Sequence, residues 1–128
     1  MKNRSVLVTG SSTGIGKATS LYLDKKGYKV YAGIRKDLDA IKLKSESSDL
    51  LTPIILDVKN LSLIENAIEV INNDSTNQLY GIVNNAGIGI NGVLEAVDIE
   101  DIRQLMDVNV IGLLALTKKF IPLLKKSK

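Results

Sequence analysis

Short apolar runs alternate along this chain with segments that have the period of a helix. The apolar runs predict four strands, over residues 5–8, 28–34, 53–56 and 79–83. Between and after them, apolar positions recur at three and four residues, which predicts helices over 15–26, 38–44, 60–71 and 99–124. Continuous apolar strands separated by helices are typical of a parallel sheet covered on both faces. We therefore expect an α/β fold with a doubly wound parallel sheet, in which right-handed crossovers give the strand order 3-2-1-4.

Polar residues next to these segments predict where the helices begin. Asp37 is expected to cap the second helix, and Asp98 the last one. The third helix begins at Asn60 or at Ser62, because Ser62 and Glu65 have the spacing of a capping box. No linker, repeat or low-complexity segment interrupts the pattern, so all 128 residues are expected to belong to one domain.

The composition excludes several classes of function. The chain has no cysteine and no histidine, so disulfides, zinc sites built on those residues and His-activated nucleophiles are excluded, and no metal is expected. A net charge of +3 and 4% aromatic residues argue against a nucleic-acid partner. The longest apolar stretch, residues 108–116, has a helical period and is too short for a membrane span. We interpret it as a buried helix and expect a cytoplasmic location with no membrane partner.

A glycine-rich loop separates the first strand from the first helix. Gly10, Gly14 and Gly16 have the spacing Gly-x3-Gly-x-Gly, where a plain turn would need only one glycine. At such a junction, backbone N–H groups and the positive end of the helix favour a phosphate. A Walker loop would need glycine and a hydroxyl where the chain has Ser11 and Ala18, so the spacing indicates a dinucleotide. The expected contacts in this loop are Gly10, Ser11, Ser12, Thr13, Gly14, Ile15 and Gly16.

The end of the second predicted strand bears on which dinucleotide is bound. In Rossmann-type folds an acidic residue, about 20 residues past the glycines, binds the ribose 2′-hydroxyl of NAD. Residues 32–36 contain no carboxylate here, and Arg35 can bind a 2′-phosphate through two hydrogen bonds. A solvated basic pair, Arg35 and Lys36, is the alternative. We expect NADP(H) to be preferred over NAD(H).

Four motifs, in this order, resemble those of the short-chain dehydrogenase/reductase family. Thr9–Gly16 resembles its coenzyme loop, and Leu56–Val58 resembles the segment whose aspartate receives the adenine amino group. Asn84–Gly87 matches its strand-four motif, and Asp107–Gly112 resembles the segment around its catalytic asparagine. The resemblance covers nearly the whole chain. It implies a Rossmann-type oxidoreductase that transfers a hydride between NADP(H) and a small carbonyl or alcohol substrate.

The resemblance also adds residues to the expected site. It implies coenzyme contacts from Asp57, Val58, Asn85, Ala86 and Gly87. A role in a turn is the alternative for Asp57. We expect the strand-four motif to serve partly as scaffold, because asparagine side chains can tie neighbouring strands together, and partly as a support for the coenzyme.

Asn109 interrupts the apolar stripe of the last predicted helix, between Met106 and Leu113. A buried amide without partners costs about 1–3 kcal/mol, and such a conflict often marks a functional site. The resemblance implies that Asn109 is catalytic and that it distorts the helix, so that a backbone carbonyl holds a water of the proton relay. The alternative is a buried amide that a neighbouring loop satisfies.

The family's catalytic serine and its Tyr-x3-Lys motif have no counterpart in this sequence. Only Tyr22 and Lys26 have the right spacing, and we reject them because they lie in the first predicted helix. The chain is therefore expected to be an N-terminal portion, truncated before the fifth strand, with strand four as an unprotected edge and no turnover alone. A nucleotide-binding half-domain or an inert fragment is the alternative. The whole enzyme is expected to be a homo-oligomer, since the last helix often forms a subunit interface in this family.

Overall fold

The computed structural model describes residues 3–127, and the strands of this part form a single parallel sheet in the order β3-β2-β1-β4. The strands are β1 (Arg4–Val8), β2 (Lys29–Ile34), β3 (Leu51–Ile55) and β4 (Gln78–Val83). The expected fold class and strand order are confirmed. β3 begins two residues before the expected Pro53, which pairs with Ala32. Proline lacks an N–H group and is tolerated there because β3 is an edge strand.

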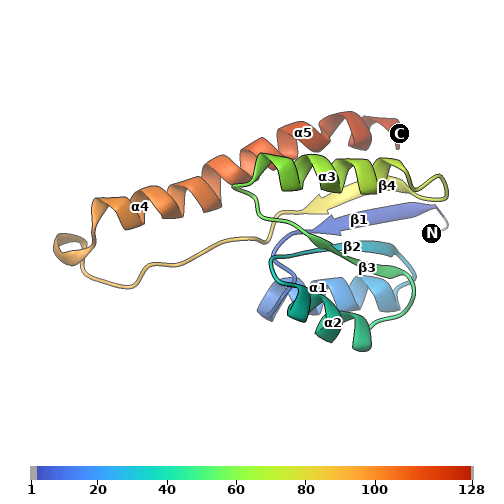
Figure 1. Cartoon of the computed structure of the whole chain (residues 1–128), viewed down its shortest axis with the longest axis horizontal. Coiled ribbons are helices and arrows are strands. Elements are labelled where there is room, and N and C mark those ends of the chain that lie inside the picture. Colours follow the sequence, from blue (N-terminus) through green and yellow to red (C-terminus); the bar gives the residue numbers. More distant parts are fainter. Residues whose placement is uncertain (1–2, 128) are drawn as a thin grey trace.

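Helices cover both faces of this sheet. They are α1 (Gly14–Lys25), α2 (Asp37–Ser45), α3 (Leu61–Asn72), α4 (Ile99–Met106) and α5 (Leu113–Lys126), together with the short 3-10 helix η1 (Leu94–Ala96) and the π-helical segment η2 (Asp107–Gly112). In Figure 1, α1 and α2 lie on one face of the sheet, and α3 and α5 lie on the other. This is the three-layer arrangement of a doubly wound fold.

Two hydrophobic cores lie on the two faces because side chains alternate along each strand. Val6 and Val8 of β1 belong to the core under α1 and α2, whereas Leu7, between them, belongs to the core under α3 and α5. Phe120 of α5 is fully buried in the second core. Burial of a side chain of this size contributes about 1.5–3 kcal/mol, so α5 is held firmly along this part of its length.

Asn60, one of the two expected starts of the third helix, is the N-cap residue of α3. Its side-chain oxygen accepts a hydrogen bond from Leu63 N at 3.2 Å, so the first turn of the helix is capped. The capping box expected from Ser62 and Glu65 is not formed. The helix already begins at Leu61, which places Ser62 inside its first turn.

Of the other two predicted caps, Asp37 is not at the N-cap position, and Asp98 is at that position but forms no capping hydrogen bond. Lys36 occupies the N-cap position of α2, and Asp37 is the first helical residue, where a carboxylate still interacts favourably with the helix dipole. Asp98 occupies the N-cap position of α4, as expected, but its side chain makes no capping hydrogen bond. Neighbouring carboxylates, Glu100 and Asp101, lie in that first turn.

α4, η2 and α5 follow one another as a long helix, and its α4 end extends beyond the sheet (Figure 1). The interpretation of residues 108–116 as a buried helix is wrong: Gly112 and Leu116 are buried, but Ile111 and Leu114 are 56% and 58% exposed. The physical reason is that the sheet and α3 cover only one face of this helix. Among residues 3–127, no helix is long and apolar enough to cross a membrane.

Candidate functional site

A cavity of about 510 Å³ opens at the carboxyl ends of the four strands. Segments that follow β1, β2, β3 and β4 contribute to its lining, and α4 and η2 close one side. Doubly wound sheets bind ligands in this position. The lining residues are Gly10, Ser12, Thr13, Ile34, Arg35, Leu56, Asp57, Val58, Lys59, Asn85, Ala86, Gly87, Ile88, Gln104 and Val108.

The glycine loop lies close against the segment that follows β4. Gly10 has a φ of +67°, and a Cβ atom there would lie 2.9 Å from Ala86 Cα. A Cβ atom on Gly16 would collide with the carbonyl oxygen of Gly10 and with the Asn85 amide. These positions therefore need glycine so that the backbone of the loop can make its close turn.

The start of α1 has the donors that an anionic group needs. Thr13 is the N-cap residue, and no side chain caps the first N–H groups of the helix. Ser12 and Thr13 line the cavity beside them. Free N–H groups and the positive end of the helix dipole at this point are chemically suited to a pyrophosphate.

Other residues of the loop lie outside the cavity lining. Ser11 is fully buried: its hydroxyl donates to Val8 O and accepts from the Ser20 hydroxyl, both at 2.9 Å, and its N–H donates to Gly33 O. Ser11 therefore holds the loop against the strands. Gly14, Ile15 and Gly16 are also absent from the lining, and Ile15 is largely exposed.

Arg35 lies more than 20 residues before Asp57 and Val58 in the sequence, and all three line the same cavity. Asp57 also forms a turn, because its Oδ1 accepts from Lys59 N at 2.9 Å and its carbonyl accepts from Asn60 N. The turn engages one carboxylate oxygen, and Oδ2 has no hydrogen bond among the described residues. Both interpretations of Asp57, in a turn and in a binding site, are therefore compatible with its geometry.

The strand-four motif ties the loops after β1 and β4 together. The Asn85 amide donates to the carbonyl oxygens of Thr9 and Gly10, at 3.0 Å each. The Thr9 hydroxyl accepts from the N–H groups of Asn85 and Ala86 at 3.0 and 2.9 Å. Asn84 donates to Thr117 of α5. The asparagines are thus scaffold, while Asn85, Ala86 and Gly87 also line the cavity.

Asn109 lies in the π-helical segment and is satisfied by a neighbouring loop. Its Oδ1 accepts from Ile88 N and its Nδ2 donates to Ile88 O, both at 2.8 Å. Asn109 does not line the cavity itself, but Gly87, Ile88 and Val108 around it do. The Asn109 amide is therefore satisfied by a neighbouring loop, and the helix around it is also distorted. Short π-helical segments of this kind are frequent at functional sites.

Six lining residues were missed from the sequence: Ile34, Leu56, Lys59, Ile88, Gln104 and Val108. Lys59 directly follows the predicted pair Asp57 and Val58, and this adjacency could have suggested it. Leu56 and Val108 lie inside two of the motifs, Leu56–Val58 and Asp107–Gly112. Gln104 had no local signal, because it reaches the cavity only through the position of α4 in the fold.

The tyrosines lie away from this cavity in the part of the chain that the structure describes. Tyr31 is buried on the α3 face, and its hydroxyl donates to Asp74 Oδ2 at 2.6 Å. Burial and this hydrogen bond raise the pKa of Tyr31, which opposes any role as a proton donor near neutral pH. Tyr22, on α1, is 60% exposed, and Lys26 lies over its ring.

Comparison with known proteins shows which family the chain resembles. Residues 4–128 match the family model described as short chain dehydrogenase. The chain is 36% identical over 132 residues to rat D-beta-hydroxybutyrate dehydrogenase, mitochondrial, and this match covers 98% of the chain and 38% of the rat protein. The chain thus spans well under half the length of this curated relative.

Two solved structures have the same fold and carry coenzymes. The closed form of serine dehydrogenase, complexed with NADP⁺, has a TM-score of 0.88 at 29% identity over 96% of this chain and 50% of its own. The 3-ketoacyl-(acyl-carrier-protein) reductase from Brucella melitensis, complexed with NADH, has a TM-score of 0.86 at 27% identity over 98% of this chain and 51% of its own.

Proposed function

Because the chain belongs to the short-chain dehydrogenase family, we propose that it forms the coenzyme-binding part of an oxidoreductase that transfers a hydride between NADP(H) and a small carbonyl or alcohol substrate. The observation that carries this proposal is one cavity that is lined by Gly10, Asp57 and Gly87, from three of the motifs, and by Arg35, from the end of β2. The bound nicotinamide supplies the hydride chemistry. The chain's own residues bind and orient the coenzyme.

Each motif has a role that its geometry supports. The loop after β1 and the uncapped start of α1 hold the pyrophosphate. Asp57 Oδ2 accepts from the adenine amino group, and Val58 forms the wall beside the base. Gly87 lets the coenzyme approach the backbone, and Asn109 fixes the adjoining loop through Ile88. Asn109 also keeps the helix distorted, so that a backbone carbonyl of the helix can hold a water of the proton relay.

The preference for NADP(H) rests on Arg35. Relatives of the same fold carry NADP⁺ in one case and NADH in another, so the preference depends on this chain's own residues. Arg35 is exposed at the cavity, and the described residues place no carboxylate within ion-pair distance of it. A 2′-phosphate can therefore bind its guanidinium without competition.

Replacing Arg35 tests this preference. Arg35→Ala is expected to weaken NADPH binding about ten- to hundredfold, the loss of a charge-assisted hydrogen-bond pair, and to leave NADH binding nearly unchanged. Fluorescence titration with both coenzymes measures the ratio. Lys36→Ala is the matched control, since Lys36 is the neighbouring cation and does not line the cavity. An unchanged ratio in Arg35→Ala would show that NADP(H) is not selected here.

We do not expect turnover from these 128 residues alone, because no tyrosine of the described residues lines the coenzyme cavity. They bind coenzyme as a half-domain.

We also propose that copies of the whole protein associate through the exposed face of α4 and α5, and that the protein is cytoplasmic. Fluorescence microscopy of the tagged whole protein tests the location.

A further inference from the structure

Lys59 is the second cation of the coenzyme cavity, and none of the four motifs includes it. It comes after β3 and two residues after Asp57, and it lines the cavity with Arg35, Asp57 and Val58. Its backbone is fixed, because its N–H donates to Asp57 Oδ1 at 2.9 Å and Asn60 N–H donates to Asp57 O at 3.0 Å. The root of the side chain is therefore held beside the carboxylate by a turn.

The charges around Lys59 favour an anion. The cavity lining holds two cations, Arg35 and Lys59, and a single carboxylate, Asp57. Four ion pairs are present among residues 3–127, and neither Arg35 nor Lys59 takes part in any of them. One oxygen of Asp57 is already engaged by the turn. The charged side chains of the cavity lining therefore have a net positive charge.

We propose that Lys59 is a specificity-determining residue, which acts with Arg35 to select a coenzyme that carries a phosphate on its adenosine ribose. The inference rests on the proposed function and extends it from one cation to two. A phosphate monoester has a charge of about −1.5 to −2 near neutral pH, so a single guanidinium does not neutralise it. A flexible ammonium group on a fixed root can supply the remaining charge.

The experiment measures binding of the adenosine end alone. Isothermal titration calorimetry compares 2′,5′-ADP with 5′-ADP on the 128-residue chain and on Lys59→Gln, Lys59→Arg and Lys36→Gln. Lys59→Gln is expected to reduce the preference for 2′,5′-ADP about three- to tenfold, as befits one partly exposed ion pair. Lys59→Arg keeps the charge and should keep most of the preference.

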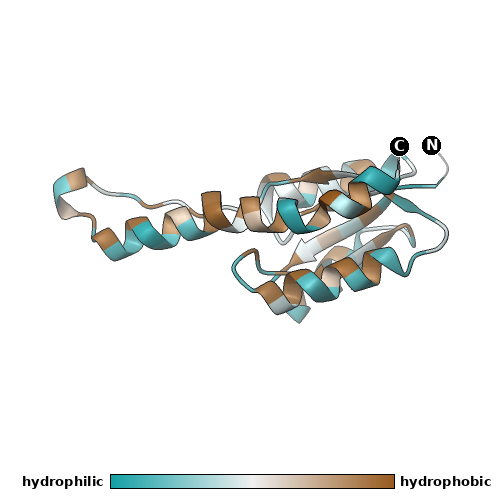
Figure 2. Cartoon of the chain, turned by 90° about the horizontal axis from the view of Figure 1, so that it is seen from above, coloured by the Kyte–Doolittle hydropathy of each residue, from teal (hydrophilic) through white to brown (hydrophobic). Residues whose placement is uncertain are grey.

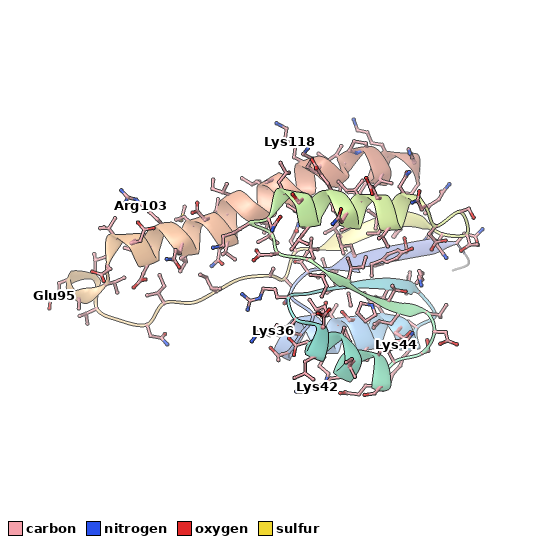
Figure 3. The ribbon with its side chains drawn as sticks, viewed as in Figure 1. Lys36, Lys42, Lys44, Glu95, Arg103 and Lys118 are labelled. Carbon is pink, nitrogen blue, oxygen red and sulfur yellow. The ribbon has the colours of Figure 1, made fainter. Side chains whose placement is uncertain are left out.

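Lys36→Gln is the matched control, because it removes a charge from the start of α2, where Figure 3 labels Lys36, outside the cavity lining. An unchanged preference in Lys59→Gln overturns the proposal, and so does an equal loss in Lys36→Gln, which would indicate a general effect of charge. If the unmodified chain binds neither ligand, the proposed function itself fails. If it binds both equally well, the NADP(H) preference fails and coenzyme binding survives.

Discussion

At the scale of single residues, Tyr31 and Asp74 are the two described residues whose pKa values are clearly shifted, and they are hydrogen-bonded to each other. Tyr31 is 2% exposed on β2, and Asp74, in the turn between α3 and β4, also accepts hydrogen bonds from Thr76 and Asn77. Burial raises the pKa of Tyr31, and the Asp74 carboxylate raises it further. Burial acts against the charged form of Asp74, but hydrogen bonds from Thr76, Tyr31 and Asn77 outweigh it and lower its pKa.

This pair predicts a pH-dependent stability. Tyr31→Phe is expected to lower the free energy of unfolding by about 1.5–3 kcal/mol at pH 7, the contribution of a hydrogen bond to a charged group. The raised pKa of Tyr31 makes its contribution complete below about pH 10, and the contribution decreases as the pH rises from there through the raised pKa. The lowered pKa of Asp74 makes its contribution complete above about pH 4, and that contribution decreases as the pH falls from there through the lowered pKa. The cost of the substitution should therefore shrink at both extremes.

Urea unfolding at about pH 3, 7 and 10.5 measures this dependence. Tyr80→Phe is the control, because Tyr80 is 51% exposed on β4 and its hydroxyl has no hydrogen bond among the described residues. A surface change of this kind is expected to alter the free energy of unfolding by less than about 0.5 kcal/mol. A cost of Tyr31→Phe that stayed constant across the three pH values would contradict the coupling to Asp74.

At the scale of elements, the strands and their order could be predicted, because the alternation of apolar runs and helical periods is a local signal. The sequence also placed Arg35, Asp57 and Gly87 in one site, since each follows a strand and the carboxyl ends of parallel strands meet at one edge. Prediction failed where packing decides. Leu114 belongs to the apolar stretch that we interpreted as a buried helix but is 58% exposed, and Gln104 lines the cavity only because α4 lies beside it.

The π-helical segment η2 links two walls of the coenzyme cavity. On one side, Asn109 forms two hydrogen bonds with the backbone of Ile88. On the other side, Gly112 lies against the loop that follows β3, where a Cβ atom on Gly112 would come within 2.8 Å of Val58 Cγ2 and 2.9 Å of Val58 O. The backbone oxygen cannot move without moving the turn that holds Asp57. A side chain at position 112 would therefore separate the helix from Val58, which lines the cavity.

Gly112→Ala is accordingly expected to destabilise the chain by about 1–3 kcal/mol through overpacking and to weaken coenzyme binding. Thermal unfolding and NADPH titration measure the two effects. Gly89→Ala is the control, because a Cβ atom at Gly89, in the loop after β4, would meet nothing within 4 Å. Wild-type stability and affinity in Gly112→Ala would show that the close contact with Val58 has no role in shaping the cavity.

At the scale of the whole molecule, two surfaces lack cover among the described residues. β4 pairs only with β1, so its other edge is open, as expected from the sequence, and a cavity of about 560 Å³ lies between β4 and α5. The long helix also exposes apolar residues, and the ribbon of Figure 2 is brown at several turns of this helix. These are Met106, Val110, Ile111, Leu114 and Ile121, between 36% and 58% exposed.

Charges on either side of this apolar region indicate how two copies would pair. The acidic arm, residues 94–105, precedes it and carries Glu95, Asp98, Glu100 and Asp101 against one cation, Arg103. The last part of the helix is basic, with Lys118, Lys119, Lys125 and Lys126. Figure 3 shows Glu95 and Lys118 on well-separated parts of the molecule. A second copy in antiparallel orientation would place its basic end against the acidic arm, with the apolar residues between them, and a two-fold axis would make both contacts at once.

This arrangement predicts self-association that depends on apolar contact and on charge. Sedimentation velocity should show a dimer of the chain, and Leu114→Glu should shift it towards monomer by placing a charge in the apolar centre. Exchanging the signs at Glu100 and Asp101 (Glu100→Lys, Asp101→Lys) should weaken the dimer, and adding Lys125→Glu and Lys126→Glu should restore it. Lys42→Glu, on α2 away from this helix (Figure 3), is the control. Pairing through the open edge of β4 instead would leave the dimer of Leu114→Glu intact, because that edge does not include residue 114.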